Sequence, residues 1–129
     1  MALRDGKPYM SWGTPGGDQQ DQWSCQFFLR HASKSTPAPK MNLQEAIDAP
    51  AWHIEHFPLS FWPRTARPGV LVVEGRLPKA TIKELERRGH KVVRTRTNSG
   101  GYQAILIDPK TNVLRGGSEF RKDGAAVGY

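Results

Sequence analysis

Gly13-Thr14-Pro15-Gly16-Gly17-Asp18 is the stretch on which the interpretation of this chain depends. It lies between a strand-like pattern over residues 1–12 and a helical pattern over residues 19–32. A Gly-Gly pair at such a junction lets the backbone bend sharply and present its N–H groups to a ligand, because glycine has no Cβ atom. The following helix adds the positive end of its dipole at the same point. The stretch therefore predicts either an anion or oxyanion cradle at Gly16 and Gly17, or a tight turn with Asp18 as the helix cap.

The segments on either side of this junction have clear patterns. Asp5-Gly6 separates two short strand-like runs, which is a hairpin signal. In the following helix, an apolar stripe is expected to face the core, and its members are Cys25, Phe28, Leu29 and Ala32, widened by Trp23 and Phe27. We expect Cys25, the single cysteine, to be a buried structural thiol rather than a nucleophile.

The rest of the chain alternates short helices and strands. Asn42 and Glu45 form a capping-box pattern at the start of a short helix that Pro50 ends. A second helix is expected from Pro78 to about Arg88, with Gly89 after its end. Strands are expected at residues 52–57, 70–74, 91–97, 102–107 and 113–115. Because a short turn joins the last two strands, they are antiparallel, and the order predicts an α+β fold in one domain over residues 1–129.

Composition limits the kinds of partner. The chain has 129 residues, a net charge of +7 and no apolar run long enough to span a membrane, so no membrane partner is expected. The N-terminus lacks a signal-peptide pattern, and the compartment stays open between cytoplasm and periplasm. Basic residues are densest between 76 and 96, but aromatic residues are not interleaved with them. A solvated helix-strand face is therefore preferred there, and no nucleic-acid partner is expected.

Other candidate sites are weaker. His53 and His56 would face opposite sides of a strand, so they would not chelate one metal ion together. We expect no metal site and no cofactor. The serines show no pattern of a Ser-His-Asp triad.

Four stretches together resemble the gamma-glutamyltransferase family, in the C-terminal part of its small subunit. The order and spacing of these stretches also match that family, and the resemblance covers essentially the whole chain. The stretches are residues 13–17 (GTPGG), 42–50 (NLQEAIDAP), 85–92 (LERRGHKV) and the tail, with residues 117–118 (GS) and 121–129 (RKDGAAVGY).

The resemblance implies a portion of an N-terminal-nucleophile hydrolase αββα sandwich, with an antiparallel sheet and flanking helices. In that family the precursor cuts itself to expose a threonine, which attacks a γ-glutamyl amide. The backbone N–H groups of Gly16 and Gly17 match the pair that looks like the family's oxyanion hole.

Several family features have no counterpart here. The nucleophilic threonine and the residues that grip the glutamate belong upstream, and Met1 is not a Thr, Ser or Cys. Residues 18–22 (DQQDQ) are more polar than in the best-known transferases, and Glu119-Phe120 replaces a frequent Asp-Pro. We therefore expect the chain to be inactive alone and to pair with the upstream part of the same precursor, namely the large subunit and the N-terminal part of the small subunit.

Three functional hypotheses follow. The first is the C-terminal fragment of a γ-glutamyl transferase or hydrolase that acts on a γ-glutamyl small-molecule substrate. The second is a fragment of a related acylase, acting on a β-lactam side chain or another acyl amide. The third is a non-catalytic binding module. An incomplete sandwich would leave apolar sheet surface exposed, so the first hypothesis also predicts self-association.

Overall fold

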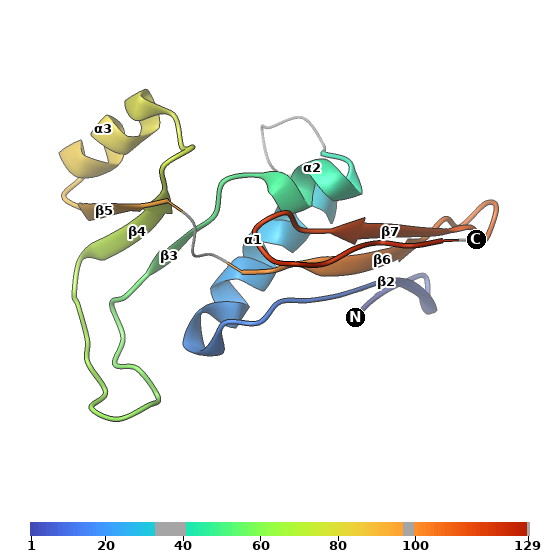
Figure 1. Ribbon diagram of the computed structural model, residues 1–129, viewed down its shortest axis with the longest axis horizontal. Helices are drawn as coiled ribbons and strands as arrows, with labels where there is room; N and C mark the ends of the chain where they lie inside the picture. Colours follow the sequence, from blue (N-terminus) through green and yellow to red (C-terminus); the bar gives the residue numbers. More distant parts are fainter. Residues whose placement is uncertain (33–40, 97–99, 129) are drawn as a thin grey trace.

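The computed structural model of the chain describes residues 1–32, 41–96 and 100–128. Two sheets lie side by side along the long axis of the molecule (Figure 1). The four-stranded sheet has the order β1-β2-β6-β7, and the three-stranded sheet has the order β3-β4-β5. No helix in the described residues is long and apolar enough to cross a membrane.

The four-stranded sheet is antiparallel throughout. It consists of β1 (Ala2–Arg4), β2 (Lys7–Gly13), β6 (Gln103–Ile107) and β7 (Leu114–Ser118). The predicted hairpin at Asp5-Gly6 is confirmed, with φ of 51° and 74° at these two residues. Two successive positive φ angles match the twist of a tight hairpin turn. β2 pairs with β6, about 90 residues later, and this long-range pairing was not part of the sequence prediction.

Two helices cover one face of this sheet: α1 (Gln20–Ala32) and α2 (Leu43–Asp48). The predicted capping box at Asn42 and Glu45 is present. The main core lies between these helices and the sheet, and its fully buried members include Phe27, Ile47 and Tyr102.

The buried face of α1 differs from the predicted stripe. Trp23, Phe27 and His31, spaced four residues apart, are buried, whereas Cys25 is exposed and Leu29 is 44% exposed. The prediction of Cys25 as a buried thiol was therefore wrong. The large rings of Trp23 and Phe27 take the centre of the face, and Cys25 lies roughly 160–200° around the helix from them, at about 100° per residue.

The three-stranded sheet holds a smaller core. β3 (Trp52–Ile54) pairs antiparallel with β4 (Val70–Glu74), which pairs parallel with β5 (Lys91–Thr95). The crossover between the parallel strands is α3 (Lys79–Arg87), whose Ile82 packs on Leu71 and Val73. The strand predicted at 52–57 is shorter than expected and ends at Ile54. The strand predicted at 91–97 spans Lys91–Thr95, and residue 97 lies outside the described residues.

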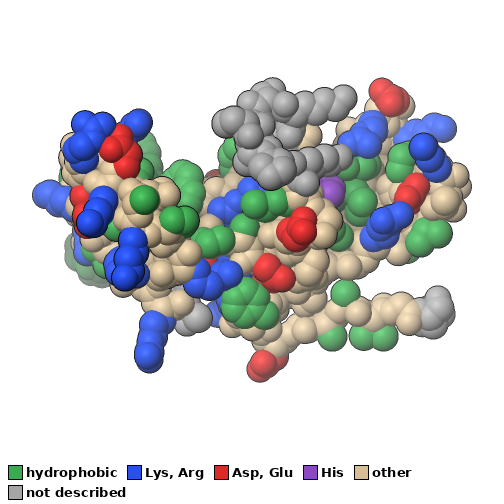
Figure 2. Space-filling model, turned by 90° about the horizontal axis from the view of Figure 1, so that it is seen from above, with side chains coloured by type: hydrophobic (Ala, Val, Ile, Leu, Met, Phe, Trp, Pro, Cys, Tyr) green, Lys and Arg blue, Asp and Glu red, His purple; other side chains and the backbone are tan. Residues whose placement is uncertain are grey.

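Basic side chains gather over α3 and β5 at one end of the molecule, on the left in Figure 2. Glu84 forms ion pairs with Arg87 and Arg88 on this surface. This arrangement is that of a solvated helix face.

A buried charged cluster joins the two sheets. The guanidinium of Arg121 contacts Glu74 of β4 and Glu119 just after β7, and the three side chains are 2% exposed or less. Arg121 also donates to the Ala49 carbonyl at 3.1 Å, at the end of α2. Burial alone raises the pKa of the Glu74 carboxyl, but the hydrogen bonds and charge of Arg121 outweigh burial and hold that pKa below its usual value.

The predicted fold class is confirmed: the chain is α+β, with an antiparallel sheet and flanking helices. The second face of the four-stranded sheet carries Ser11, Ile105 and Gly116 in one row of the strand register. Ile105 is 51% exposed there. The helices α1 and α2 thus cover only one of the two faces.

Candidate functional site

The turn after β2 brings two glycines into conformations with positive φ, which residues with a side chain adopt less readily. Gly16 has φ 142° and ψ 15°, and Gly17 has φ 61°. A Cβ atom on Gly16 would lie 2.1 Å from Cζ3 of Trp23, so the indole packs directly against this backbone. A Cβ atom on Gly17 would instead meet its nearest neighbour, Phe61, at 3.7 Å. Gly16 is therefore required by both packing and conformation, whereas Gly17 is favoured by conformation alone.

The N–H groups of these glycines are available to a ligand. Among the described backbone groups outside regular helices and strands, no hydrogen bond uses the N–H of Gly16 or Gly17 as donor. The 3-10 turn η1 (Gly17–Gln19) and then α1 follow directly. Unpaired N–H groups at the start of a helix carry partial positive charge, and this favours an anion.

Asp18 has a different role from the predicted cap. Gly16 occupies the N-cap position of η1, so Asp18 falls inside the turn. Its carboxylate accepts hydrogen bonds from the hydroxyl and the backbone N–H of Ser60, the latter at 2.7 Å. The hydroxyl of Ser60, followed by its N–H, lowers the pKa of Asp18. This contact ties the segment between β3 and β4 to the glycine turn.

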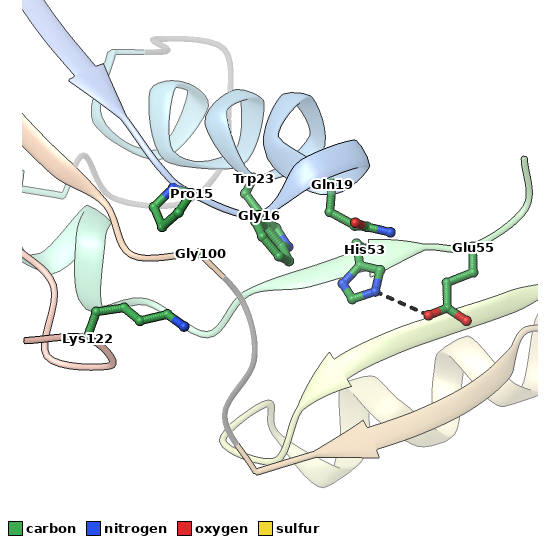
Figure 3. A pocket seen from close by; sticks show the side chains of 8 residues that line it. All are labelled: Pro15, Gly16, Gln19, Trp23, His53, Glu55, Gly100 and Lys122. Carbon is green, nitrogen blue, oxygen red and sulfur yellow. Dashed lines mark ion pairs between the residues drawn. The ribbon is translucent and has the colours of Figure 1, made fainter. Parts of the chain in front are cut away.

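A pocket opens beside Gly16, and sequence reasoning did not find it. It is lined by Pro15, Gly16, Gln19, Trp23, His53, Glu55, Gly100 and Lys122 (Figure 3). These residues come from the glycine turn with η1, the start of α1, β3 with the residue just after it, the segment before β6, and the tail. Only the tertiary structure brings these five segments together.

His53 is the central side chain of this pocket. It is 6% exposed, and its Nε2 lies 3.6 Å from Oε1 of Glu55. Its ring meets Trp23 edge-on, with the ring centroids 5.5 Å apart. Burial lowers the pKa of His53 more than the hydrogen bond and charge of Glu55 raise it, so the imidazole is neutral near pH 7.

A second pocket lies next to the first, beside Gly17. Glu55, Leu59, Phe61, Thr65 and Arg67 contribute to it together with residues 16–19. Within this second pocket, Arg67 forms an ion pair with Glu55. The Glu55 carboxylate thus contacts His53 of the first pocket and Arg67 of the second. Gly16, Gln19 and Glu55 line both pockets, and the glycine turn therefore faces a polar hollow and a partly aromatic one.

His53 and His56 lie in different surroundings. His53 points into the first pocket, whereas Nδ1 of His56 accepts a hydrogen bond from Gly69. In residues 1–32, 41–96 and 100–128, no three His, Cys, Asp or Glu side chains come together as a metal site would require.

Comparisons with known proteins place this chain. The family model described as gamma-glutamyltranspeptidase matches residues 1–129. A glutathione hydrolase-like proenzyme, YwrD of Bacillus subtilis, is 33% identical over 99% of this chain and 23% of its own length. The acylase ACY 1 proenzyme of Pseudomonas sp. is 32% identical over 98% of this chain and 20% of its own length.

Solved structures of similar proteins have the same fold as this chain. The structure of LmbA2991HD shares 47% identity and a TM-score of 0.84, covering 92% of this chain and 21% of that one. The fold is thus a portion of the N-terminal-nucleophile hydrolase sandwich found in solved members of this group. The chain spans about a fifth of the length of the curated relatives that it matches. On these matches, and on the motifs of its sequence, the chain belongs to the gamma-glutamyltranspeptidase family.

Proposed function

We propose that this chain completes an acyl-transfer site whose oxyanion hole is formed by the backbone N–H groups of Gly16 and Gly17. One observation carries the proposal: two adjacent N–H groups, with no acceptor among residues 1–32, 41–96 and 100–128, lie at a helix start beside a pocket. Such donors stabilise the oxyanion of a tetrahedral intermediate, and each contributes about 3–4 kcal/mol in the transition state.

The nucleophile is supplied by another segment in this proposal. A threonine upstream in the precursor attacks the acyl carbonyl and forms an acyl-enzyme. Water or an amine then takes up the acyl group. The substrate is a γ-glutamyl amide, and the partner is the rest of the precursor. The exposed row at Ile105 is a surface on which that partner would pack, and without it the chain would self-associate.

A γ-glutamyl anilide cleavage assay tests this proposal. The chain is assayed alone and mixed with the separately expressed upstream segment. We expect activity in the mixture only. Turnover by the chain alone would contradict the assignment of the nucleophile to another segment.

Matched glycine variants sharpen the assay. Gly17→Ala should lower kcat in the mixture by about 10²–10³-fold, because the strained turn reorients a donor. Gly13→Ala is the control, since Gly13 lies in β2 without a positive φ and an added Cβ would meet no atom of the described residues within 4 Å. Equal loss in both variants would count against the oxyanion hole.

An acylase is the second candidate. The similarity to acylase ACY 1 and the Phe61 side of the second pocket favour a bulkier acyl group than glutamyl. The mixture would then cleave an aromatic acyl amide faster than a γ-glutamyl anilide. A non-catalytic module would instead be a clean monomer by gel filtration with light scattering, with no activity in any mixture.

A further inference from the structure

The loop between β3 and β4 carries three large aromatic side chains in solvent. Phe57 is 73% exposed, Phe61 is 68% exposed and Trp62 is 89% exposed. Large apolar side chains that gather in solvent mark a contact with another molecule more often than chance. Aromatic residues and Arg are also enriched in protein interfaces. Residues 55–69, the aromatic loop, therefore have the composition of an interface.

Backbone hydrogen bonds order the aromatic loop. The N–H of Arg67 donates to the Glu55 carbonyl at 2.8 Å, and the N–H of Leu59 donates to the Thr65 carbonyl at 3.1 Å. These bonds join the two arms of the loop, which extends away from both sheets (Figure 1). The ion pair between Arg67 and Glu55 closes its base. A loop that is already ordered loses little conformational entropy on binding, so its side chains suit a docking contact.

Charge on the aromatic loop limits the chemistry of its partner. Residues 56–73 contain no Asp or Glu. Arg64 lies in the turn at the tip, where its N–H donates to the Phe61 carbonyl at 2.7 Å. Its side chain is exposed and forms no ion pair with the described residues. The complementary surface therefore offers an apolar hollow for the rings and an acidic side chain for Arg64.

The aromatic loop borders the glycine turn. Ser60 donates from its hydroxyl and its N–H to the Asp18 carboxylate. Phe61 is the neighbour that a Cβ atom on Gly17 would meet, and it lines the second pocket. In the proposed reaction, a nucleophile from another segment attacks a carbonyl carbon held at this turn, from a distance of about 3–3.5 Å. The segment that carries the nucleophile must therefore pass beside the aromatic loop.

We propose that the aromatic loop docks on the upstream part of the same precursor, the part that carries the nucleophile. Most of the length of the curated relatives lies outside the part that this chain matches, so a large partner is at hand. Phe57 and Trp62 enter an apolar hollow of that partner, and Arg64 pairs with an acidic side chain at the rim. Docking then holds the nucleophile against the glycine turn. This assignment rests on the proposed function, because the docked part is the one that supplies the nucleophile.

Co-expression of the 129-residue chain with a tagged upstream segment tests the docking. The chain is recovered on the tag from dilute lysate, where recovery below saturation follows the association constant. We expect Trp62→Ser to be recovered about tenfold less than the unchanged chain, as for a residue at the centre of an interface. Val93→Ser, which changes an exposed side chain on β5, is the control. No recovery of the unchanged chain, or equal recovery of Trp62→Ser, would overturn the proposal.

Fluorescence gives a second readout of the same contact. Trp62 is the most exposed of the four tryptophans, so acrylamide quenches it most readily. Trp62→Phe keeps a ring for docking and removes this signal. We expect the difference in quenching between the unchanged chain and Trp62→Phe to be present in the free chain and absent in the co-purified complex. A difference that persists in the complex would contradict the docking.

A charge reversal tests the acidic side chain of the partner. Arg64→Glu should lower recovery on the tag by about threefold or more, because it sets like charges against each other. Lys110→Glu is the control, since it changes the net charge equally in the turn between β6 and β7. Equal recovery of the two variants would refute the acidic contact.

Other outcomes separate the alternatives. If a second copy of the chain covers the aromatic loop, Trp62→Ser reduces self-association in light scattering and leaves recovery on the tag unchanged, which refutes the proposal. Recovery that depends on Trp62 without anilide cleavage leaves the contact standing and refutes the acyl-transfer site. Cleavage with equal recovery of Trp62→Ser refutes the docking alone.

Discussion

The cluster around Arg121 and the pocket around His53 are both buried and polar, but they differ in how their hydrogen-bonding groups are satisfied. Each carboxylate of the cluster accepts from Arg121 and from a backbone N–H: Glu74 from Ala51 and Glu119 from Tyr102. In the pocket, Nδ1 of His53 and Nε1 of Trp23 have no hydrogen-bond partner in the part of the chain that the structure describes. A satisfied cluster stabilises one arrangement of the chain, whereas open donors and acceptors are available for binding.

The largest effect should come from breaking the cluster. Arg121→Met leaves Glu119 buried without a cation and leaves Glu74 with Arg76 alone, and we expect a loss of about 3–5 kcal/mol in the free energy of unfolding. Urea denaturation followed by circular dichroism measures this loss. Arg115→Met, which removes an exposed ion pair to Asp108, is the control and should change little. Equal stability of Arg121→Met and the unchanged chain would show that the cluster does not hold the two sheets together.

An intermediate effect on stability should come from substitutions of Gly16 and Gly17 in the turn beside the pocket. Gly17→Ala places an alanine at φ 61° and should cost about 1–2 kcal/mol in the same denaturation experiment. Gly16→Ala should cost more, because its Cβ would overlap the Trp23 ring at 2.1 Å and displace it. Near-ultraviolet circular dichroism should report the moved indole in Gly16→Ala only. The reverse order of stability would contradict the packing of Trp23 on Gly16.

The smallest effect should come from His53. Burial lowers the pKa of His53, so the unfolded chain binds a proton more readily than the folded chain below about pH 6.5. Stability should therefore fall as the pH drops through this range. In His53→Gln this part of the pH dependence should disappear, while stability at pH 7.5 changes by about 1 kcal/mol or less. The reason is that Nδ1 has no hydrogen-bond partner among the described residues and that the contact of Nε2 with Glu55 is long, at 3.6 Å. Denaturation at pH 7.5, 6.5 and 5.5 tests it, and an unchanged pH slope would contradict the burial argument.

Local signals predicted local structure well in this chain. Asp5-Gly6 predicted a hairpin and Asn42 with Glu45 predicted a capped helix, because both depend on residues a few positions apart. The strand Val70–Glu74 was also predicted correctly from its β-branched run. Two local predictions were wrong because distant residues decided the outcome. Asp18 binds Ser60 instead of capping the helix. Trp23 and Phe27 pack on His53 and Tyr102, and this turns Cys25 on the opposite side of the helix toward solvent.

The sequence by itself determined the family, the α+β class, the element order and the glycine pair, since these follow from motifs and from the periodicity of neighbouring residues. Only the tertiary structure decided which residues surround that pair. Trp23, His53 and Lys122 lie 30 and 69 positions apart along the chain, and no local pattern links them. Arg121 and Glu74 likewise meet only because the tail crosses the junction of the two sheets, where burial makes their pairing obligatory.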